Sequence, residues 1–489
     1  MTRDWTDADL KAVFADYRPR TPPRRHQLVS LAWSLPMKRV AYWHGIGTGK
    51  SLTALYTHDL WGTERHLIVC PNSVVGEWVK QIRQHLGEEP VVLRGSREDR
   101  RDLLALPGRR TFVVNYEGLL VLFCDREERT TKEGKAKTAH LLDADAILDA
   151  DLDGVTADEC HCLANEKAVQ TRVFHALSMA AERAIIMTGT PISTSDEDLW
   201  AEYWCLDGGV TLGGTKWPFL RRHFRQKFFG GWQVKSAEER RVLLGRVAPV
   251  TLRFSREECV DLPPRTYETR RCQMSADQER LYALIANGQT WNDGGRTFGP
   301  VDPGQAANKL GQVAGGFFLW GDEAVRLADN PKADLLAELL RDVGDEKVIV
   351  FHAYVEEGRI IESVLDRQGI GYASLRGEVV DKEGAVTRFL SDPECRVMVA
   401  HPKSGGVGLN LQAASVAVFW SNGMSTATVR QQAEGRIYRQ GQERPVVIVD
   451  LELEGSLDER HLERIEDQAD LQAAALEFVR QYGQGKKKD

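Results

Sequence analysis

Seven short runs rich in Val and Ile constrain the fold of this 489-residue chain most strongly. Such runs are typical of strands that are buried on both faces of a parallel sheet, and helical patterns fall between them. Alternation of strand and helix predicts parallel sheets joined by right-handed crossovers. The runs form two groups, which predicts an α/β protein with two lobes. The runs are residues 66–70, 111–116, 184–189, 347–351, 396–400, 416–420 and 446–450.

The segment between the two groups is helical and irregular in pattern, which predicts a helical insertion. After it, Ser456 and Glu459 form a capping box ahead of a helical pattern, which predicts a C-terminal helix. A charged stretch at about 125–150 is interpreted as a surface excursion of the first lobe. The expected parts are a first lobe at 1–205, an insertion with the inter-lobe linker at 206–330, a second lobe at 331–455 and a C-terminal helix at 456–489.

Composition excludes several classes of protein. The net charge is −7, so a nucleic-acid partner would have to meet a local basic surface. No apolar run reaches about eighteen residues, and the first ten residues include acidic ones, so we expect neither a membrane span nor export. The eight cysteines include no CxxC pair, and Cys160 with Cys162 lacks the partner pair of a zinc site. A cytoplasmic protein with reduced thiols is the expectation.

A glycine-rich loop, HGIGTGKS at 44–51, lies between a strand-like run and a helix, which is the context of a phosphate-binding loop. Its glycines let the backbone N–H groups face the phosphates of ATP. Lys50 would reach the β- and γ-phosphates, and the Ser51 hydroxyl would bind Mg²⁺. His44 stands where the strict pattern has Gly or Ala, so a chance glycine turn is the alternative. The candidate ATP-binding residues here are Gly45, Gly47, Thr48, Gly49, Lys50 and Ser51.

An adjacent carboxylate pair, Asp158 and Glu159, ends the short apolar segment before Cys160. Such a pair suits ATP hydrolysis, because one carboxylate can hold Mg²⁺ while the next orients and deprotonates the attacking water. With His161 following, the pair has the DExH form of helicase motors. We assign Asp158 to the metal and Glu159 to the water.

From about residue 20 to 480 the chain resembles the Swi/Snf family of helicase superfamily two. The final motif separates that family from the DExH RNA helicases. Residues 423–432 lack the "WNP" of chromatin remodellers, and Ser193 or Thr194 replaces a usual asparagine, so the chain is more similar to compact phage and bacterial members. The matching segments are RRHQLVSLAW (24–33), LIVCPNSVVGEW (67–78), VVNYEGL (113–119), DECHCLAN (158–165), MTGTPISTSDEDLW (187–200), SREECVDLPPRT (255–266), SLRGEV (374–379), KSGGVGLNLQ (403–412) and QQAEGRIYRQGQ (431–442).

The resemblance implies two RecA-like lobes that complete one ATP site. Gln27 would recognise adenine, and Gly408 and Gln432 would also contact the nucleotide. Arg436 and Arg439, one helical turn apart, would stabilise the charge of the phosphoryl transition state from the second lobe. The DNA-contact candidates in the motifs are Asn72, Trp78, Tyr116, Thr188, Thr190, Lys403, Ser404, Gly405 and Asn410.

A basic and aromatic stretch at 208–237 contains no Asp or Glu, which suits sequence-independent contact with DNA phosphates. The alternative is a helix with aromatics in its core and a solvated basic face. Stacking of the aromatics on single-stranded bases is a further option, but core packing is favoured. The DNA-contact candidates here are Arg221, Arg222, Arg225 and Lys227, with Lys216 and Lys235 nearby.

The sequence favours an ATPase that tracks along duplex DNA as a monomer, in the cytoplasm of a bacterium or a phage-infected host. It names no recruiting protein. A strand-unwinding or annealing DNA helicase is the nearest alternative, followed by a DExH RNA helicase. A non-hydrolysing, nucleotide-dependent DNA-binding module would require a broken catalytic residue, and Lys50, Asp158, Glu159 and Arg439 are all present.

Overall fold

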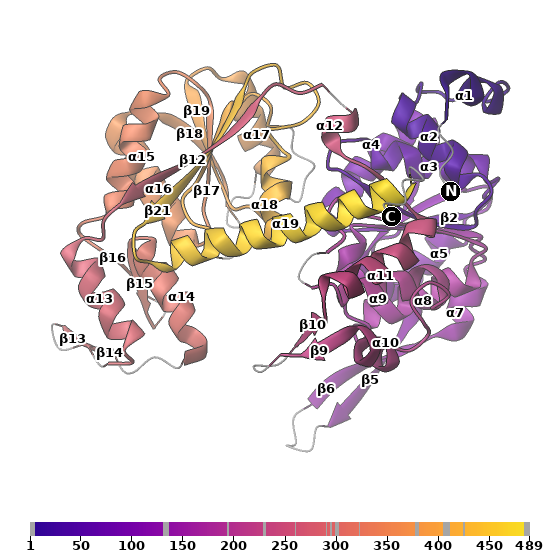
Figure 1. The fold of residues 1–489 in the computed structure, drawn as a ribbon, viewed down its shortest axis with the longest axis horizontal. Helices are drawn as coiled ribbons and strands as arrows, with labels where there is room; N and C mark the ends of the chain where they lie inside the picture. Colours follow the sequence, from indigo (N-terminus) through magenta and orange to yellow (C-terminus); the bar gives the residue numbers. More distant parts are fainter. Residues whose placement is uncertain are drawn as a thin grey trace. The chain divides into compact units, whose positions relative to one another are not determined.

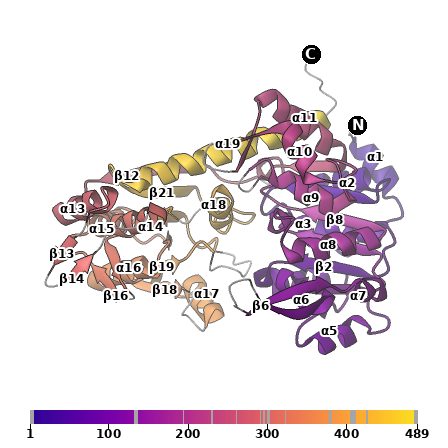
Figure 2. The ribbon, with the colours of Figure 1, turned by 90° about the horizontal axis from the view of Figure 1, so that it is seen from below.

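The computed structural model describes residues 5–130, 136–192, 195–227, 231–259, 261–289, 291–293, 296–298, 303–321, 323–376, 381–403, 411–423 and 426–483. The chain divides into two compact units, residues 1–260 with 470–489, and residues 261–469. Each unit is built on a parallel sheet covered by helices (Figures 1 and 2). This arrangement confirms the predicted α/β class with two parallel-sheet lobes.

The sheet of the first unit has the strand order β11-β1-β8-β7-β2-β4-β3, and every pair is parallel. In β2, Leu67 and Val69 pack into the core on one face, while Ile68 and Cys70 pack into the core on the other. The strands are β1 (Arg39–His44), β2 (His66–Cys70), β3 (Val91–Val92), β4 (Thr111–Asn115), β7 (Gly154–Asp158), β8 (Arg183–Met187) and β11 (Thr251–Phe254). The helices are α1 (Asp7–Val13), α2 (Arg25–Ser34), α3 (Lys50–Leu60), α4 (Val75–His85), α5 (Arg97–Leu104), α6 (Tyr116–Phe123), α7 (Ala144–Asp149), α8 (Val169–Ala180), α9 (Asp198–Asp207), α10 (Lys216–His223), α11 (Ala237–Val247) and α12 (Arg256–Cys259).

Two antiparallel hairpins extend the first unit. The charged stretch expected as a surface excursion forms the hairpin β5–β6, which projects from the helices around it (Figure 1). The basic stretch forms α10 and the hairpin β9–β10. Neither hairpin was predicted, because β5 and β6 are rich in charged and polar residues and β9 and β10 are only three residues long. Their bounds are β5 (Cys124–Thr130), β6 (Ala136–Leu142), β9 (Phe224–Gln226) and β10 (Trp232–Val234).

The insertion expected at 206–330 differs from the observed organisation. β11 pairs with β1 in the first sheet, whereas β12 (Arg265–Cys272) pairs with β21 in the second. The expected segment therefore belongs partly to each unit, and the units divide between residues 260 and 261. Both strands lie at the edge of their sheets, where polar residues are tolerated, so they lack the apolar signature of a buried strand.

The sheet of the second unit has the order β12-β21-β20-β17-β19-β18, again parallel throughout. In β17, Ile349 and Phe351 join one core cluster and Val348 and Val350 join another. The sheet strands after β12 are β17 (Val348–Phe351), β18 (Gly371–Leu375), β19 (Cys395–Ala400), β20 (Val416–Phe419) and β21 (Val446–Leu453). The remaining elements are α13 (Ala276–Ala286), β13 (Trp291–Asp293), β14 (Arg296–Phe298), α14 (Pro303–Ala314), β15 (Phe317–Trp320), β16 (Glu323–Arg326), α15 (Pro331–Asp342), α16 (Val355–Gln368), α17 (Lys382–Ser391) and α18 (Ala427–Glu434).

The predicted C-terminal helix is α19, Leu457–Gly483. At its start the Ser456 hydroxyl accepts a hydrogen bond from the backbone N–H of Asp458, and Glu459 accepts one from Gly455. Among the helices that the structure describes, none combines the length and the apolar character that crossing a membrane requires.

Candidate functional site

The glycine-rich loop joins β1 to α3, as the sequence predicts. Gly47 and Gly49 adopt φ values of 82° and 85°, a left-handed region that favours glycine. α3 begins at Lys50, whose Nζ lies 3.1 Å from the carbonyl oxygen of His44 and 3.5 Å from that of Gly45. The lysine therefore lies over the loop at the N-terminus of a helix, where an anion is stabilised. Ser51 follows it in the first turn.

Two side chains of α2 hold the far end of the loop. Gln27 Nε2 donates to the carbonyl oxygens of Gly49 and Thr48 at 3.2 and 3.4 Å, and His26 Nε2 lies 2.9 Å from the Thr48 oxygen. The Gln27 oxygen accepts from the backbone N–H of Arg24 at 2.8 Å. The structure thus places Gln27 beside the phosphate loop. His26 was not predicted, because a lone histidine in a helix carries no motif signal.

His44, the residue that departs from the loop pattern, is buried at the end of β1. Its Nε2 lies 3.0 Å from the hydroxyl of Ser30, and its ring packs against Phe254 and Tyr42. Burial, more than the nearby positive charges, holds the pKa of His44 well below its usual range, so the imidazole is neutral. A neutral ring packed among aromatics explains why this position tolerates a large side chain.

Asp158 ends β7 and is fixed by two aromatic side chains. Trp78 Nε1 donates to Asp158 Oδ2 at 2.9 Å, and the Tyr116 hydroxyl donates to the Asp158 carbonyl oxygen at 2.7 Å. Trp78 and Tyr116 are only 2% and 3% exposed. Their prediction as DNA contacts is therefore corrected, because both lie in the core, where Trp78 holds the carboxylate and Tyr116 holds the backbone of Asp158. Asn72 remains exposed at the start of the turn Asn72–Val74.

Glu159 follows with a left-handed φ of 52°, which is strained for a residue with a side chain. Its Oε2 accepts from the hydroxyl of Thr188 at 3.2 Å and lies 3.3 Å from Nδ1 of His161. The Thr188 hydroxyl in turn accepts from the backbone N–H of Thr190 at 3.0 Å. These hydrogen bonds link the TGT segment to Glu159. Both threonines are buried, so neither side chain is exposed for contact with DNA.

The two carboxylates have opposite electrostatic environments. Burial raises the pKa of Asp158 to about 6, and the charge of Glu159 adds to this effect. Burial also acts to raise the pKa of Glu159, but the hydrogen bond and charge of His161, with Lys50 and Thr188, lower it to about 2. The contacts of Glu159 therefore favour its ionised form. Asp158 is the one that a cation would stabilise in its charged form.

The basic stretch divides into paired and exposed side chains. Lys216 pairs with Glu166 at 2.7 Å, and Lys235 donates to the carbonyl oxygens of Arg221 and Arg222 at 2.8 and 2.7 Å. Arg221, Arg222, Arg225 and Lys227 are exposed, as is Lys235, and Arg225 also donates to the side-chain oxygen of Gln233 at 3.4 Å.

The aromatic residues of this stretch also divide. Phe219 and Phe224 are buried, in keeping with the favoured interpretation as core. Trp217 is 59% exposed and lies edge-on to Trp232, with ring centroids 5.7 Å apart. Phe228 and Phe229 lie outside the described residues.

In the second unit, the predicted arginines follow α18 rather than lying on it. α18 ends at Glu434, so Arg436 and Arg439 occupy turns and their expected spacing by one helical turn is corrected. Arg436 Nη2 donates to the carbonyl oxygen of Pro402 at 2.8 Å, and burial lowers the pKa of this arginine to about 10. Lys403 is exposed. The candidates Ser404, Gly405, Gly408 and Asn410 lie outside the described residues.

Gln442, the last residue of the Gly-Gln ending, holds these turns in place. It is 6% exposed, and its Nε2 donates to the carbonyl oxygens of Ala414, Gln412 and Ile437 at 2.9, 3.2 and 3.3 Å. The glutamine of this motif thus stabilises the turns that carry Arg436 and Arg439 through its buried hydrogen bonds.

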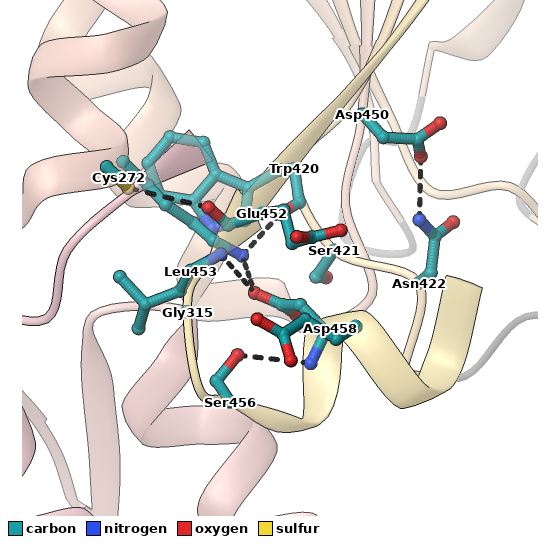
Figure 3. A network of polar contacts seen from close by, with 12 residues as sticks. Cys272, Gly315, Trp420, Ser421, Asn422, Asp450, Glu452, Leu453, Ser456 and Asp458 are labelled. Carbon is teal, nitrogen blue, oxygen red and sulfur yellow. Dashed lines mark hydrogen bonds and ion pairs between the residues drawn. The ribbon is translucent and has the colours of Figure 1, made fainter. Parts of the chain in front are cut away.

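A network of buried polar side chains holds α18 against β20 and β21. Arg430 donates to both oxygens of Asp450, at 2.6 and 2.8 Å, and to Glu434 at 2.7 Å, while its guanidinium stacks 3.5 Å from the ring centroid of Phe419. Asn422 donates to Asp450 at 2.8 Å (Figure 3). Because a broken buried ion pair is costly, this network fixes the helix that precedes Arg436.

A second group of buried polar contacts holds the start of the C-terminal helix. Lys332 is fully buried, and its Nζ lies 2.5 Å from Asp458 and donates to the carbonyl oxygen of Trp420 at 2.9 Å. Asp458 also accepts from the backbone N–H of Leu453 at 3.2 Å (Figure 3). Since Asp458 lies in the first turn of α19 and Lys332 lies on α15, the ion pair ties the start of α19 to α15.

Known proteins match the chain over most of its length. A family model described as "SNF2-related domain" matches residues 28–299, and one described as "Helicase conserved C-terminal domain" matches residues 331–441. The chain is 25% identical over 442 residues to "DNA repair and recombination protein RDH54" of Saccharomyces cerevisiae, covering 81% of this chain and 45% of the relative. It is 23% identical over 469 residues to "DNA repair and recombination protein RAD54B" of Mus musculus, covering 85% of this chain and 50% of the relative.

The chain therefore spans about half the length of these curated relatives. A solved structure, "Sulfolobus solfataricus SWI2/SNF2 ATPase core in complex with dsDNA", is 20% identical with a TM-score of 0.43, covering 96% of this chain and 94% of that chain.

Proposed function

Because the chain belongs to the SNF2-related family, we propose that it couples ATP hydrolysis to translocation along double-stranded DNA. Members of the family are ATP-hydrolysing enzymes, and so is this chain. The observation that carries the proposal is the set of Lys50, Asp158, Glu159 and Thr188 assembled around one loop. None of these hydrolytic residues is replaced, which disfavours a non-hydrolysing binding module.

In the proposed reaction, Gln27 contacts adenine, and the loop N–H groups with Lys50 hold the phosphates. Ser51 and Asp158 would hold Mg²⁺, which neutralises phosphate charge when bound. The residues present suit a Mg²⁺ ion, because the hydrogen bond from Trp78 orients the Asp158 carboxylate. Glu159 accepts the proton of the attacking water, while Thr188 and His161 keep that carboxylate oriented.

Arg436 and Arg439 complete the site from the second unit. An arginine fork carries a permanent charge and stabilises the equatorial oxygens of the transition state. Since these arginines and Glu159 belong to different compact units, turnover requires the units to close on ATP and to open on product release. Repetition of that cycle is the proposed stroke of the motor.

DNA is the proposed track. Two relatives are named as DNA repair and recombination proteins, and the exposed side chains of the α10 and β9–β10 segment suit the phosphates of a duplex. Contacts to phosphates carry no sequence information, which a motor that steps along DNA requires. We infer a role in remodelling DNA or protein–DNA complexes during replication, recombination or repair.

A comparison of ATP turnover with duplex and single-stranded DNA tests the proposal. We expect duplex DNA to stimulate turnover more strongly, and equal stimulation by both would contradict a duplex track. Glu159→Gln is the matched control, because it keeps the size and polarity of the side chain. We expect this variant to bind ATP but to lose turnover by roughly two orders of magnitude or more.

A further inference from the structure

Residues 254–256, which precede the second unit in the chain, lie against the phosphate loop. The backbone N–H of Gly45 donates to the carbonyl oxygen of Phe254 at 2.8 Å. A Cβ on Gly45 would lie only 2.9 Å from the backbone N of Arg256, so this approach requires glycine. The ring of Phe254 also packs edge-on against that of His44. The segment is therefore held at the loop by backbone and side chain alike.

Arg256 makes the most specific of these contacts. It is 8% exposed, and its Nε donates to the carbonyl oxygen of Ile46 at 2.6 Å. Ile46 is the residue between the first two loop glycines, and its side chain packs near Gly189 of the TGT segment, where a Cβ would lie 2.9 Å away. A charge-assisted hydrogen bond to a loop carbonyl holds one peptide plane of the loop in a fixed direction.

The orientation of that peptide plane decides where the next N–H points. A trans peptide is planar, so its C=O and the following N–H point in opposite directions, and the described chain contains no cis peptide bond. Arg256 holds the Ile46 oxygen on its own side, so the N–H of Gly47 is turned to the other side. A loop that binds phosphate needs its N–H groups turned to the anion and its carbonyl groups turned away.

We propose that Arg256 is a positioning residue for the phosphates of ATP, which fixes the Ile46–Gly47 peptide so that the Gly47 N–H is presented to the nucleotide. The proposal deepens the ATP site described above and rests on it. Arg256 does not touch the substrate; it acts through the loop. Because residue 256 lies five positions before the second unit begins, the same contact ties the phosphate loop to the chain segment that leads to that unit.

Binding of fluorescent ADP and ATP analogues to the full chain tests the proposal. Arg256→Met keeps the apolar stem and removes every donor, and we expect its affinity for both analogues to fall about tenfold. Arg256→Lys restores one cationic donor, and we expect it to recover a part of that loss. Arg246→Gln, an exposed arginine of α11, is the matched control and should bind like the wild type.

The outcomes separate this proposal from the proposed function. Wild-type protein that fails to bind nucleotide would contradict the ATP site itself. A wild type that binds, with Arg256→Met binding equally well, would overturn only the positioning role. Should Arg256→Met not fold, as judged by its thermal unfolding, Arg256→Gln replaces it with the same expectation. A fall in affinity at an unchanged unfolding temperature supports positioning over a merely structural role.

Discussion

At the scale of single residues, the carboxylates of the catalytic motif depend on partners from other motifs, some of which were predicted for a different role. Asp158 and Glu159 are recognisable in the sequence, but two of the donors that orient them, Trp78 and Thr188, lie 80 and 29 residues away in the chain. Trp78 was predicted as a DNA contact from resemblance alone. Its indole N–H instead donates to the Asp158 carboxylate, because the N–H of a buried Trp usually requires a hydrogen-bond acceptor.

Trp78→Phe should weaken the response to Mg²⁺ while the fold is kept. Phe fills most of the same apolar space but cannot donate to Asp158 Oδ2, and a hydrogen bond to a charged group is worth about 1.5–3 kcal/mol. We expect the Mg²⁺ concentration for half-maximal ATP turnover to rise about tenfold. A Mg²⁺ titration of turnover measures this value.

Trp200→Phe provides the control for that substitution. Trp200 is equally buried in the same unit, and its Nε1 donates at 2.9 Å to the carbonyl oxygen of Gly213, away from the carboxylates. An equal change in both variants would show that the effect of Trp78→Phe is a general loss of packing.

At the scale of elements, the central strands were predictable and the edge strands were not. Val348–Phe351 is apolar because both of its faces are buried, whereas Arg265–Cys272 lies at an edge and is polar at most of its positions. The phosphate loop and the carboxylate pair follow strands, so their place at the sheet was predictable too. The support by Arg256 was not, because it joins residues 210 positions apart.

Glu357 gives the second unit a predictable dependence of stability on pH. Its Oε2 caps α16 by accepting from the backbone N–H groups of Ala353 and Tyr354 and from the hydroxyl of Ser421. Burial raises the pKa of this carboxyl from about 4.5 to about 7, so the folded protein keeps a proton that the unfolded chain has lost. The resulting contribution to stability is present below pH 4.5 and is lost as the pH rises toward 7.

Glu357→Gln should remove this dependence. Gln stays neutral and can accept the same hydrogen bonds, so we expect the variant to be close to the wild type at pH 4.5 and more stable by up to about 3 kcal/mol at pH 8. Urea unfolding at the two pH values measures the difference. Glu338→Gln, on the exposed face of α15, is the control. A variant that follows the wild-type pH dependence would contradict the assignment.

At the scale of the whole molecule, the proposed function draws on residues from two compact units. The first holds the phosphate loop and the carboxylates, and the second holds Arg436 and Arg439 on turns fixed by Gln442 and Arg430. The sequence predicted this division because each half has its own motifs. It could not predict the boundary at residue 260, because the strands on either side of it carry no apolar signature.

Displacement of a third strand from a DNA triplex, with the two duplex strands labelled separately, tests the central claim most directly. The predicted result is ATP-dependent release of the third strand while the two duplex strands stay paired, and its loss in Glu159→Gln. Separation of the duplex strands would instead identify an unwinding helicase. DNA-stimulated ATP turnover without release of the third strand would contradict translocation.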